Sequence, residues 1–137
     1  MKEIIKDIWI QAESGIVVFH ESFTKSGVDE QLFGMLMSAL NSFAEELSKG
    51  GLSSFEIQEQ RFYISKRHCF NFITSSSIDV KEKAVNKEIE RLMDRFFKMY
   101  PKDILNDWNG DISIFSGFRQ EIEQMKKRLV DNFLRAL

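Results

Sequence analysis

Two histidines and one cysteine, His20, His68 and Cys69, are the side chains of this sequence best suited to nucleophilic or acid–base chemistry. A thiol nucleophile needs an imidazole within hydrogen-bond reach and a third group that orients it. His68 and Cys69 are neighbours in or beside a predicted strand, so their side chains are expected on opposite faces. His20 falls at the end of another predicted strand, where a surface or strand-end position is the simpler interpretation. The sequence therefore predicts no catalytic residue and no enzyme.

Side chains with oxygen ligands gather only once near possible metal-binding spacing, at Asp103, Asp107, Asn109 and Asp111. A calcium loop would need alternating oxygen ligands and a closing glutamate, and this stretch has neither. Turn and helix-capping roles explain these side chains better. Two histidines and one cysteine are too few for a structural zinc site, and no phosphate-binding glycine motif is present. We expect no metal and no cofactor, and the chain is not expected to be a GTPase itself.

The composition of the 137 residues is that of one soluble globular domain spanning 1–137, with 43% hydrophobic and 29% charged residues. The net charge of −2 argues against nucleic acid as a partner. A single cysteine fits a reducing compartment, and no apolar run approaches the ~18 residues of a membrane span, so a cytoplasmic protein is expected. Two basic clusters, Lys66-Arg67 and Lys126-Lys127-Arg128, would allow at most a peripheral contact with acidic lipid headgroups.

Hydrophobic periodicity predicts two strands, a helix, three strands and two helices. The strands cover 4–11 and 16–20, joined by a turn at Gly15, and then a meander within 53–77. The helices cover 29–49, with a start at Ser26 or Asp29 and a stop at Gly50-Gly51, then 79–100 and 111–137. Short connections make neighbouring strands antiparallel. The predicted fold is α+β, a five-stranded antiparallel sheet sandwiched by helices in the order β-β-α-β-β-β-α-α.

The helix predicted over 29–49 is the most informative element, because about half of its circumference is apolar. A central stripe is expected to pack on the sheet; it comprises Leu32, Leu36, Leu40, Phe43 and Leu47. A flank with Phe33, Met37 and Ala44 is then left over, either for a partner protein or for a loop or helix of the same chain. On the first interpretation the predicted interface comprises Phe33, Met37, Leu40, Asn41 and Ala44, together with whichever strand lies at the sheet edge.

The element order resembles that of the longin domain, and two segments strengthen the likeness. These are the hairpin IWIQAESGIVVFHESF and the passage from Trp108-Asn109-Gly110-Asp111 to Phe118 that opens the last helix. The chain looks like a stand-alone longin domain of the TRAPP or small-GTPase-regulator type. Roadblock domains are similar, but they typically begin with a helix and lack the second closing helix, which favours longin over roadblock.

The longin resemblance implies a non-enzymatic, longin-type interaction platform in vesicle trafficking or tethering, or in the regulation of small GTPases. Such domains commonly pair with themselves or with another longin or roadblock protein through the first helix and a sheet edge. We therefore expect the protein to dimerise, with itself or with another longin or roadblock protein, and to bind a small GTPase. The alternative is a small-molecule sensor of the PAS or GAF type, which predicts a hollow between sheet and helix lined by some of the 13 phenylalanines.

Overall fold

The computed structural model describes residues 4–22, 30–47, 53–57 and 59–125. The chain divides into two compact units, Met1–Met93 and Asp94–Leu137, and the single domain predicted over 1–137 stays a prediction. The predicted helix start at Ser26 or Asp29 and the stop at Gly50-Gly51 lie outside the described residues, as does the basic cluster of residues 126–128.

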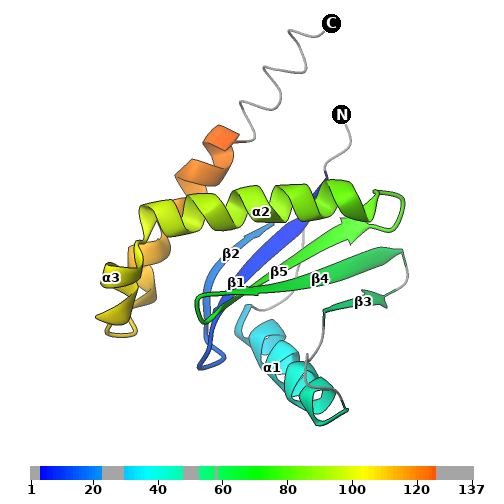
Figure 1. Ribbon diagram of the computed structural model, residues 1–137, viewed down its shortest axis with the longest axis horizontal. Coiled ribbons are helices and arrows are strands. Elements are labelled where there is room, and N and C mark those ends of the chain that lie inside the picture. Colours follow the sequence, from blue (N-terminus) through cyan, green and yellow to red (C-terminus); the bar gives the residue numbers. More distant parts are fainter. Residues whose placement is uncertain (1–3, 23–29, 48–52, 58, 126–137) are drawn as a thin grey trace, which may run out of the picture. The chain divides into compact units, whose positions relative to one another are not determined.

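A five-stranded antiparallel sheet forms the first unit (Figure 1). Its strands are β1 (Asp7–Ala12), β2 (Val17–Ser22), β3 (Ser54–Ile57), β4 (Gln60–Arg67) and β5 (Phe70–Ser77). They lie in the order β2-β1-β5-β4-β3, so β2 and β3 form the two outer edges. The predicted strand count, order along the chain and antiparallel pairing are confirmed.

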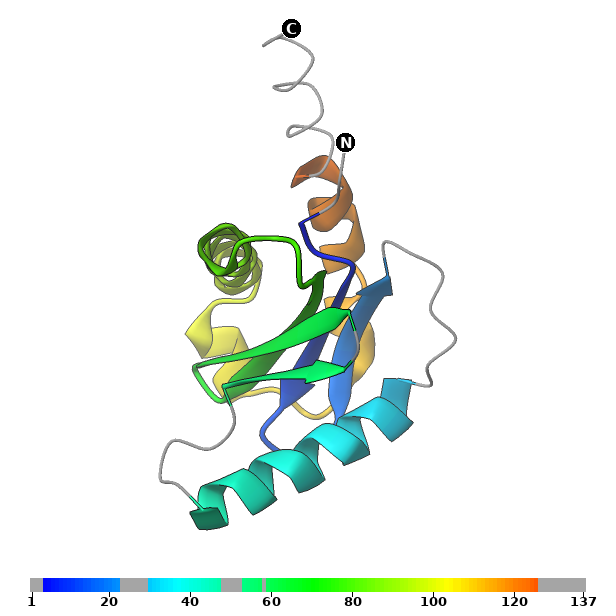
Figure 2. The same cartoon turned by 90° about the vertical axis from the view of Figure 1, so that its right-hand side faces the viewer.

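Helices lie on both faces of this sheet. α1 (Glu30–Leu47) lies over one face, and the turns of α2 (Glu82–Met99) up to residue 93 lie over the other (Figures 1 and 2). Every residue of β1 is buried, although its side chains alternate between the two faces. Because both faces are covered, Trp9 and Gln11 on the α1 side are as buried as Ile8 and Ile10 on the other. The α+β class predicted from the sequence is confirmed.

Two turns explain where the strands end. Gly15 has a φ of +95°, which a glycine adopts without strain, and it closes the β1–β2 hairpin as predicted. His68 and Cys69 form the β4–β5 turn with φ of +50° and +68°. Cys69, predicted in or beside a strand, lies beside one, because β5 begins at Phe70 and Cys69 is exposed. Successive left-handed residues match the twist of the strands that they connect.

The second unit begins in the last turns of α2, which stops before Pro101 as predicted. A short helix α3 (Lys102–Asn106) follows, and then a 3-10 turn, η1 (Ile112–Phe115). Residues 118–125 are α-helical, so the last helix starts later than the predicted 111. Asp111 caps η1 instead, by accepting a hydrogen bond from the main-chain N–H of Ser113 at 2.9 Å.

Aromatic rings form the core of this unit. Phe115 stacks near Phe96 with centroids 5.6 Å apart, and Phe118 meets Phe96 edge-on at 5.4 Å. Trp108 packs edge-on against Phe115 at 5.4 Å, and its Nε1 donates to the carbonyl of Asp111. Trp108 therefore holds the segment before η1 against the aromatic core of this unit. Among the described helices, none combines the length and the apolar character needed to cross a membrane.

Candidate interaction surface

The side-chain amide of Gln11 fastens α1 to the β1–β2 hairpin. Its Nε2 donates to the carbonyls of Gly34 at 2.8 Å and Gly15 at 3.0 Å, and it lies 3.0 Å from Oγ of Ser38. Gln11 is buried, so each of these contacts replaces a hydrogen bond to water that the amide has lost. A buried amide without such partners would cost about 1–3 kcal/mol. The hairpin therefore fixes which side of α1 faces the sheet.

Close approach of the two backbones requires glycine at position 34. A Cβ atom on Gly34 would lie 2.7 Å from Cγ2 of Val17 and 3.1 Å from the carbonyl oxygen of Gly15. A register shift next to Gln11 adds one residue to β2, so that Val17 lies opposite Gln11 on the α1 side. Gly34 thus lies on the inner side of the helix, although a mid-helix glycine is unfavourable by about 1 kcal/mol.

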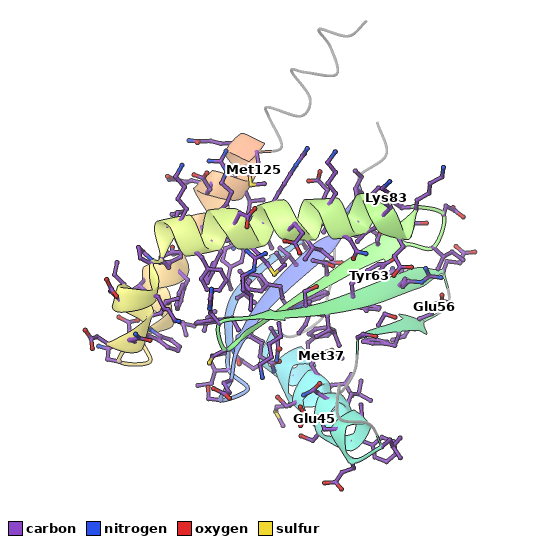
Figure 3. All side chains as sticks on the ribbon, in the orientation of Figure 1. Met37, Glu45, Glu56, Tyr63, Lys83 and Met125 are labelled. Atoms are coloured by element: carbon purple, nitrogen blue, oxygen red, sulfur yellow. The ribbon has the colours of Figure 1, made fainter. Side chains whose placement is uncertain are left out.

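An aromatic and aliphatic core fills the space between α1 and the sheet. Phe33 stacks on Trp9 with centroids 4.0 Å apart, and Met37, only 2% exposed, lies beside them (Figure 3). Phe62 of β4 and Ile73 of β5 complete this cluster. Side chains therefore occupy the space in which the sensor hypothesis would place a ligand.

The predicted orientation of α1 was wrong. Phe33 and Met37, predicted to form a free flank, are buried against the sheet, while Leu32, Leu36, Phe43 and Leu47 of the supposed inner stripe are exposed. The apolar arc of the helix is wide enough for either orientation, and a helical wheel alone does not choose between them. Gly34 was the available signal, because a glycine inside a helix often marks close backbone approach.

Five large apolar side chains project from the opposite side of α1, with exposed fractions from 50% to 74%; they are Leu32, Met35, Leu36, Phe43 and Leu47. We call this set the outer face of α1. Such exposure on side chains of this size corresponds to an apolar patch on the order of 600 Å², at the upper end of what a monomer exposes. Exposed apolar patches of this size are often sites of protein interaction, whereas single exposed apolar residues carry no such meaning.

The five residues predicted as an interface separate into two groups. Phe33 and Met37 belong to the core and are not available to a partner in this conformation. Leu40, Asn41 and Ala44 are half-buried along the side of the helix. Leu40 packs against the core cluster, and Nδ2 of Asn41 donates to Glu45 at 3.3 Å. Their use by a partner stays a prediction.

The edge strand β3 offers a second exposed element (Figure 3, where Glu56 is labelled). Phe55 is half-buried and stacks on Phe62 with centroids 4.8 Å apart, and Ile57 is exposed. The guanidinium of Arg61 on β4 pairs with the carboxylate of Glu56. The outer main-chain groups of this four-residue edge strand are the groups to which a further strand would have to bind.

A buried polar cluster lies on the α1 side of the sheet, and sequence reasoning missed it. Oγ of Ser75 donates to Oδ2 of Asp7 at 3.0 Å, and Nε2 of His20 lies 3.8 Å from Oδ1. The His20 ring stacks on Trp9 with centroids 4.9 Å apart. His20 is therefore not the surface residue that its position predicted, since its side chain is only 9% exposed. An aspartate at the start of a mainly apolar strand was the available signal.

The geometry of this cluster is structural rather than catalytic. The Ser75 hydroxyl donates a hydrogen bond to Oδ2 of Asp7, and both residues are buried, so this pair is not accessible to a substrate. Burial by itself would raise the pKa of the Asp7 carboxyl. The His20 imidazole 3.8 Å from Oδ1 and hydrogen bonds from Ser22 and Ser75 outweigh that effect, so its pKa lies below the ordinary value of 3.8. Asp7 is thus expected to be ionised at neutral pH and to tie β1, β2 and β5 together.

The lowered pKa of Asp7 predicts a specific loss of stability in acid. Asp7 contributes its full stabilisation above the unfolded-state pKa near 3.8 and loses it as pH falls through the lower folded-state value. We expect Asp7→Asn to flatten the fall of unfolding free energy below about pH 4, measured by urea denaturation between pH 2.5 and 7. Glu59→Gln, at an exposed turn, is the control. An unchanged acid slope in Asp7→Asn would contradict this assignment.

The other sequence candidates do not come together. His68 and Cys69 lie side by side in an exposed turn, and Asp111 is used as a cap. Hydrogen bonds from Ser113 hold the pKa of the Asp111 carboxyl below its usual value. In the part of the chain that the structure describes, no three His, Cys, Asp or Glu side chains are grouped so that they could hold a metal ion.

Comparison with known proteins gives matches in structure but not in sequence. No family model matches the chain, and no curated protein matches its sequence. MglB of Myxococcus xanthus is similar in structure, with a TM-score of 0.53 and 13% identity over 70% of this chain and 77% of that protein. A Roadblock/LC7 domain from Streptomyces avermitilis has a TM-score of 0.57 and 12% identity over 72% and 87%.

These matches define the fold as the one that longin and roadblock domains share. The five-stranded antiparallel sheet with helices on its faces is the architecture that the sequence resemblance implied, and the spatial order β2-β1-β5-β4-β3 is added by the structure. The chain thus has a longin/roadblock-like fold. At 12–13% identity the likeness concerns the fold alone, and the preference for longin over roadblock stays a prediction.

Proposed function

We propose that this protein is a non-enzymatic interaction platform that pairs with a second copy of itself through the outer face of α1 and the β3 edge. The exposed leucines, methionine and phenylalanine of that face carry the proposal, because α1 already buries a different side of itself in the core. The longin/roadblock-like fold supports the same function, since the resemblance implies pairing through this helix.

The outer face is complementary to itself in an antiparallel arrangement. If two copies of α1 cross near Ala39, Leu36 meets the partner's Phe43, and Leu32 meets the partner's Leu47. Ala39 is exposed and small, so the helices can approach to about 8–10 Å. A parallel arrangement would instead bring the Glu46 carboxylates of both copies together. Two such faces together exceed the ~1,000 Å² that a specific interface needs.

We further propose a small GTPase as the partner of the paired platform, working in the cytoplasm. The longin resemblance of the sequence supports this partner. A binding role rather than a catalytic one also fits the side chains, because the described residues contain no catalytic constellation. The sensor alternative has less support, because Trp9, Phe33 and Phe62 fill the space that a ligand would need.

Light scattering after size exclusion, over a concentration series, tests the pairing. We expect twice the chain mass of 16.1 kDa at micromolar concentrations. A chain that stays monomeric at the highest soluble concentration would contradict self-pairing. Co-elution with a panel of purified small GTPases, each loaded with GDP or a non-hydrolysable GTP analogue, then tests the partner class, and no co-elution in either nucleotide state would contradict it.

A further inference from the structure

The two outer edges of the sheet differ in whether a helix side chain occupies them. At β2, the side chain of Gln31 from the first turn of α1 pairs with both main-chain groups of Val17. Its Oε1 accepts from the Val17 N–H at 3.4 Å, and its Nε2 donates to the Val17 carbonyl at 3.3 Å. A carboxamide carries the same donor and acceptor as a peptide group, so Gln31 takes the place that a residue of a sixth strand would hold.

Among the described residues, no strand or helix side chain pairs with the outer side of β3. The N–H of Ile64 on β4 donates to the carbonyl of Ser53, which makes this a hydrogen-bonded pair. Alternation along an antiparallel ladder then turns the main-chain groups of Ser54 and Glu56 away from β4. Both residues are exposed, and β3 ends the described sheet on this side. Ser54 and Glu56 therefore present donors and acceptors to which an added strand can bind.

We propose that Gln31 blocks the addition of a strand at the β2 edge, so that a further strand can join the sheet only at β3. We call this role of Gln31 the edge guard. The inference rests on the proposed self-pairing and supplies a reason for that pairing to be limited to two copies. A pair joined at β3 still carries two β2 edges, one at each end of the extended sheet. If those edges were open, pairs would join end to end without closure, and chains would grow.

Gln31→Ala removes both hydrogen bonds and nothing from the core, because Gln31 is exposed. We expect the Val17 amide proton to exchange at least about tenfold faster, by hydrogen-exchange NMR, because its hydrogen bond is lost. We also expect a scattering mass that rises beyond two copies with concentration. Gln31→Glu keeps the acceptor for the Val17 N–H but loses the donor to the Val17 carbonyl. It should therefore lose the hydrogen bond to that carbonyl, as Gln31→Ala does. Ser42→Ala, exposed on the same helix, is the matched control.

The two readouts separate this inference from the proposed pairing. Faster Val17 exchange together with larger assemblies in Gln31→Ala, and neither in Ser42→Ala, supports the edge guard. Faster exchange with a mass that stays at that of the wild type overturns it and leaves Gln31 only a docking role for α1. Unchanged exchange also overturns it. A monomeric wild type whose Gln31→Ala variant assembles would support the guard while contradicting the proposed pairing.

Discussion

Met37→Asp is expected to lower the free energy of unfolding by about 4 kcal/mol or more, whereas Leu36→Asp lowers it by only about 0.5 kcal/mol. The two positions are adjacent in α1 and receive the same substitution. Met37 is 2% exposed in the cluster with Trp9 and Phe62, so an aspartate there would be a buried charge without a partner. Leu36 is 50% exposed, and its aspartate would stay in water. Chemical denaturation of the two variants at low micromolar concentration measures the difference.

Leu36→Asp, which should barely affect folding, is expected to weaken association strongly. In the proposed antiparallel pair Leu36 meets the partner's Phe43, so Leu36→Asp would bury a carboxylate against an aromatic ring twice in each pair. We expect the dissociation constant to rise at least about 100-fold, or 2.7 kcal/mol. Sedimentation equilibrium of this well-folded variant measures it. If Leu36→Asp unfolds the chain, or Met37→Asp leaves it stable, the orientation of α1 described above is wrong.

Gly34→Val is expected to cost about 3 kcal/mol of stability and to detach α1 from the hairpin. Even the first carbon of the new side chain would lie 2.7 Å from Val17, and the branched remainder would push Gln11 away from the Gly34 carbonyl. Overpacking of this kind typically costs 1–3 kcal/mol, and the lost hydrogen bonds of the buried Gln11 amide add to it. Helix propensity alone predicts the reverse, since valine is a better helix former than glycine.

Ser42→Val provides the matched comparison for Gly34→Val, because Ser42 is exposed on the same helix. Thermal unfolding should show a large drop in melting temperature for Gly34→Val and almost none for Ser42→Val. A Gly34→Val protein as stable as the wild type would mean that the backbone of α1 does not approach the hairpin closely, and would contradict the Gln11 clamp.

Much of the fold followed from the sequence because strands and helices have different periods. The alternation in β1 and β5, the short turns of the meander and the spacing of Val85, Ile89 and Phe96 each identify an element without knowledge of its neighbours. Even so, the start of the last helix was misplaced, because the cap at Asp111 opens a 3-10 turn before the α-helix begins.

The candidate surface could not be derived in the same way. Which arc of α1 faces inward depends on the residues of the sheet that lie opposite it, namely Gln11 and Val17. The hydrogen bond from Gln11 to Gly34 joins residues that are 23 positions apart in the sequence. Helical periodicity finds an apolar arc but does not say which part of a wide arc packs on the sheet. The buried pair of Asp7 and Ser75 depends in the same way on strand order, which local patterns do not specify.

The most direct test of the central claim is whether pairing covers the outer face of α1. Leu36→Cys is made in a Cys69→Ser background, because Cys69 is exposed and would itself react. The rate of maleimide modification is then followed across the concentrations at which light scattering shows pairing, with Asn86→Cys, at an exposed position of α2, as the control. We predict that modification at position 36 slows in proportion to the paired fraction, while the control rate stays constant. A rate at position 36 that stays constant as the mass doubles would contradict the claim and place the contact elsewhere on the chain.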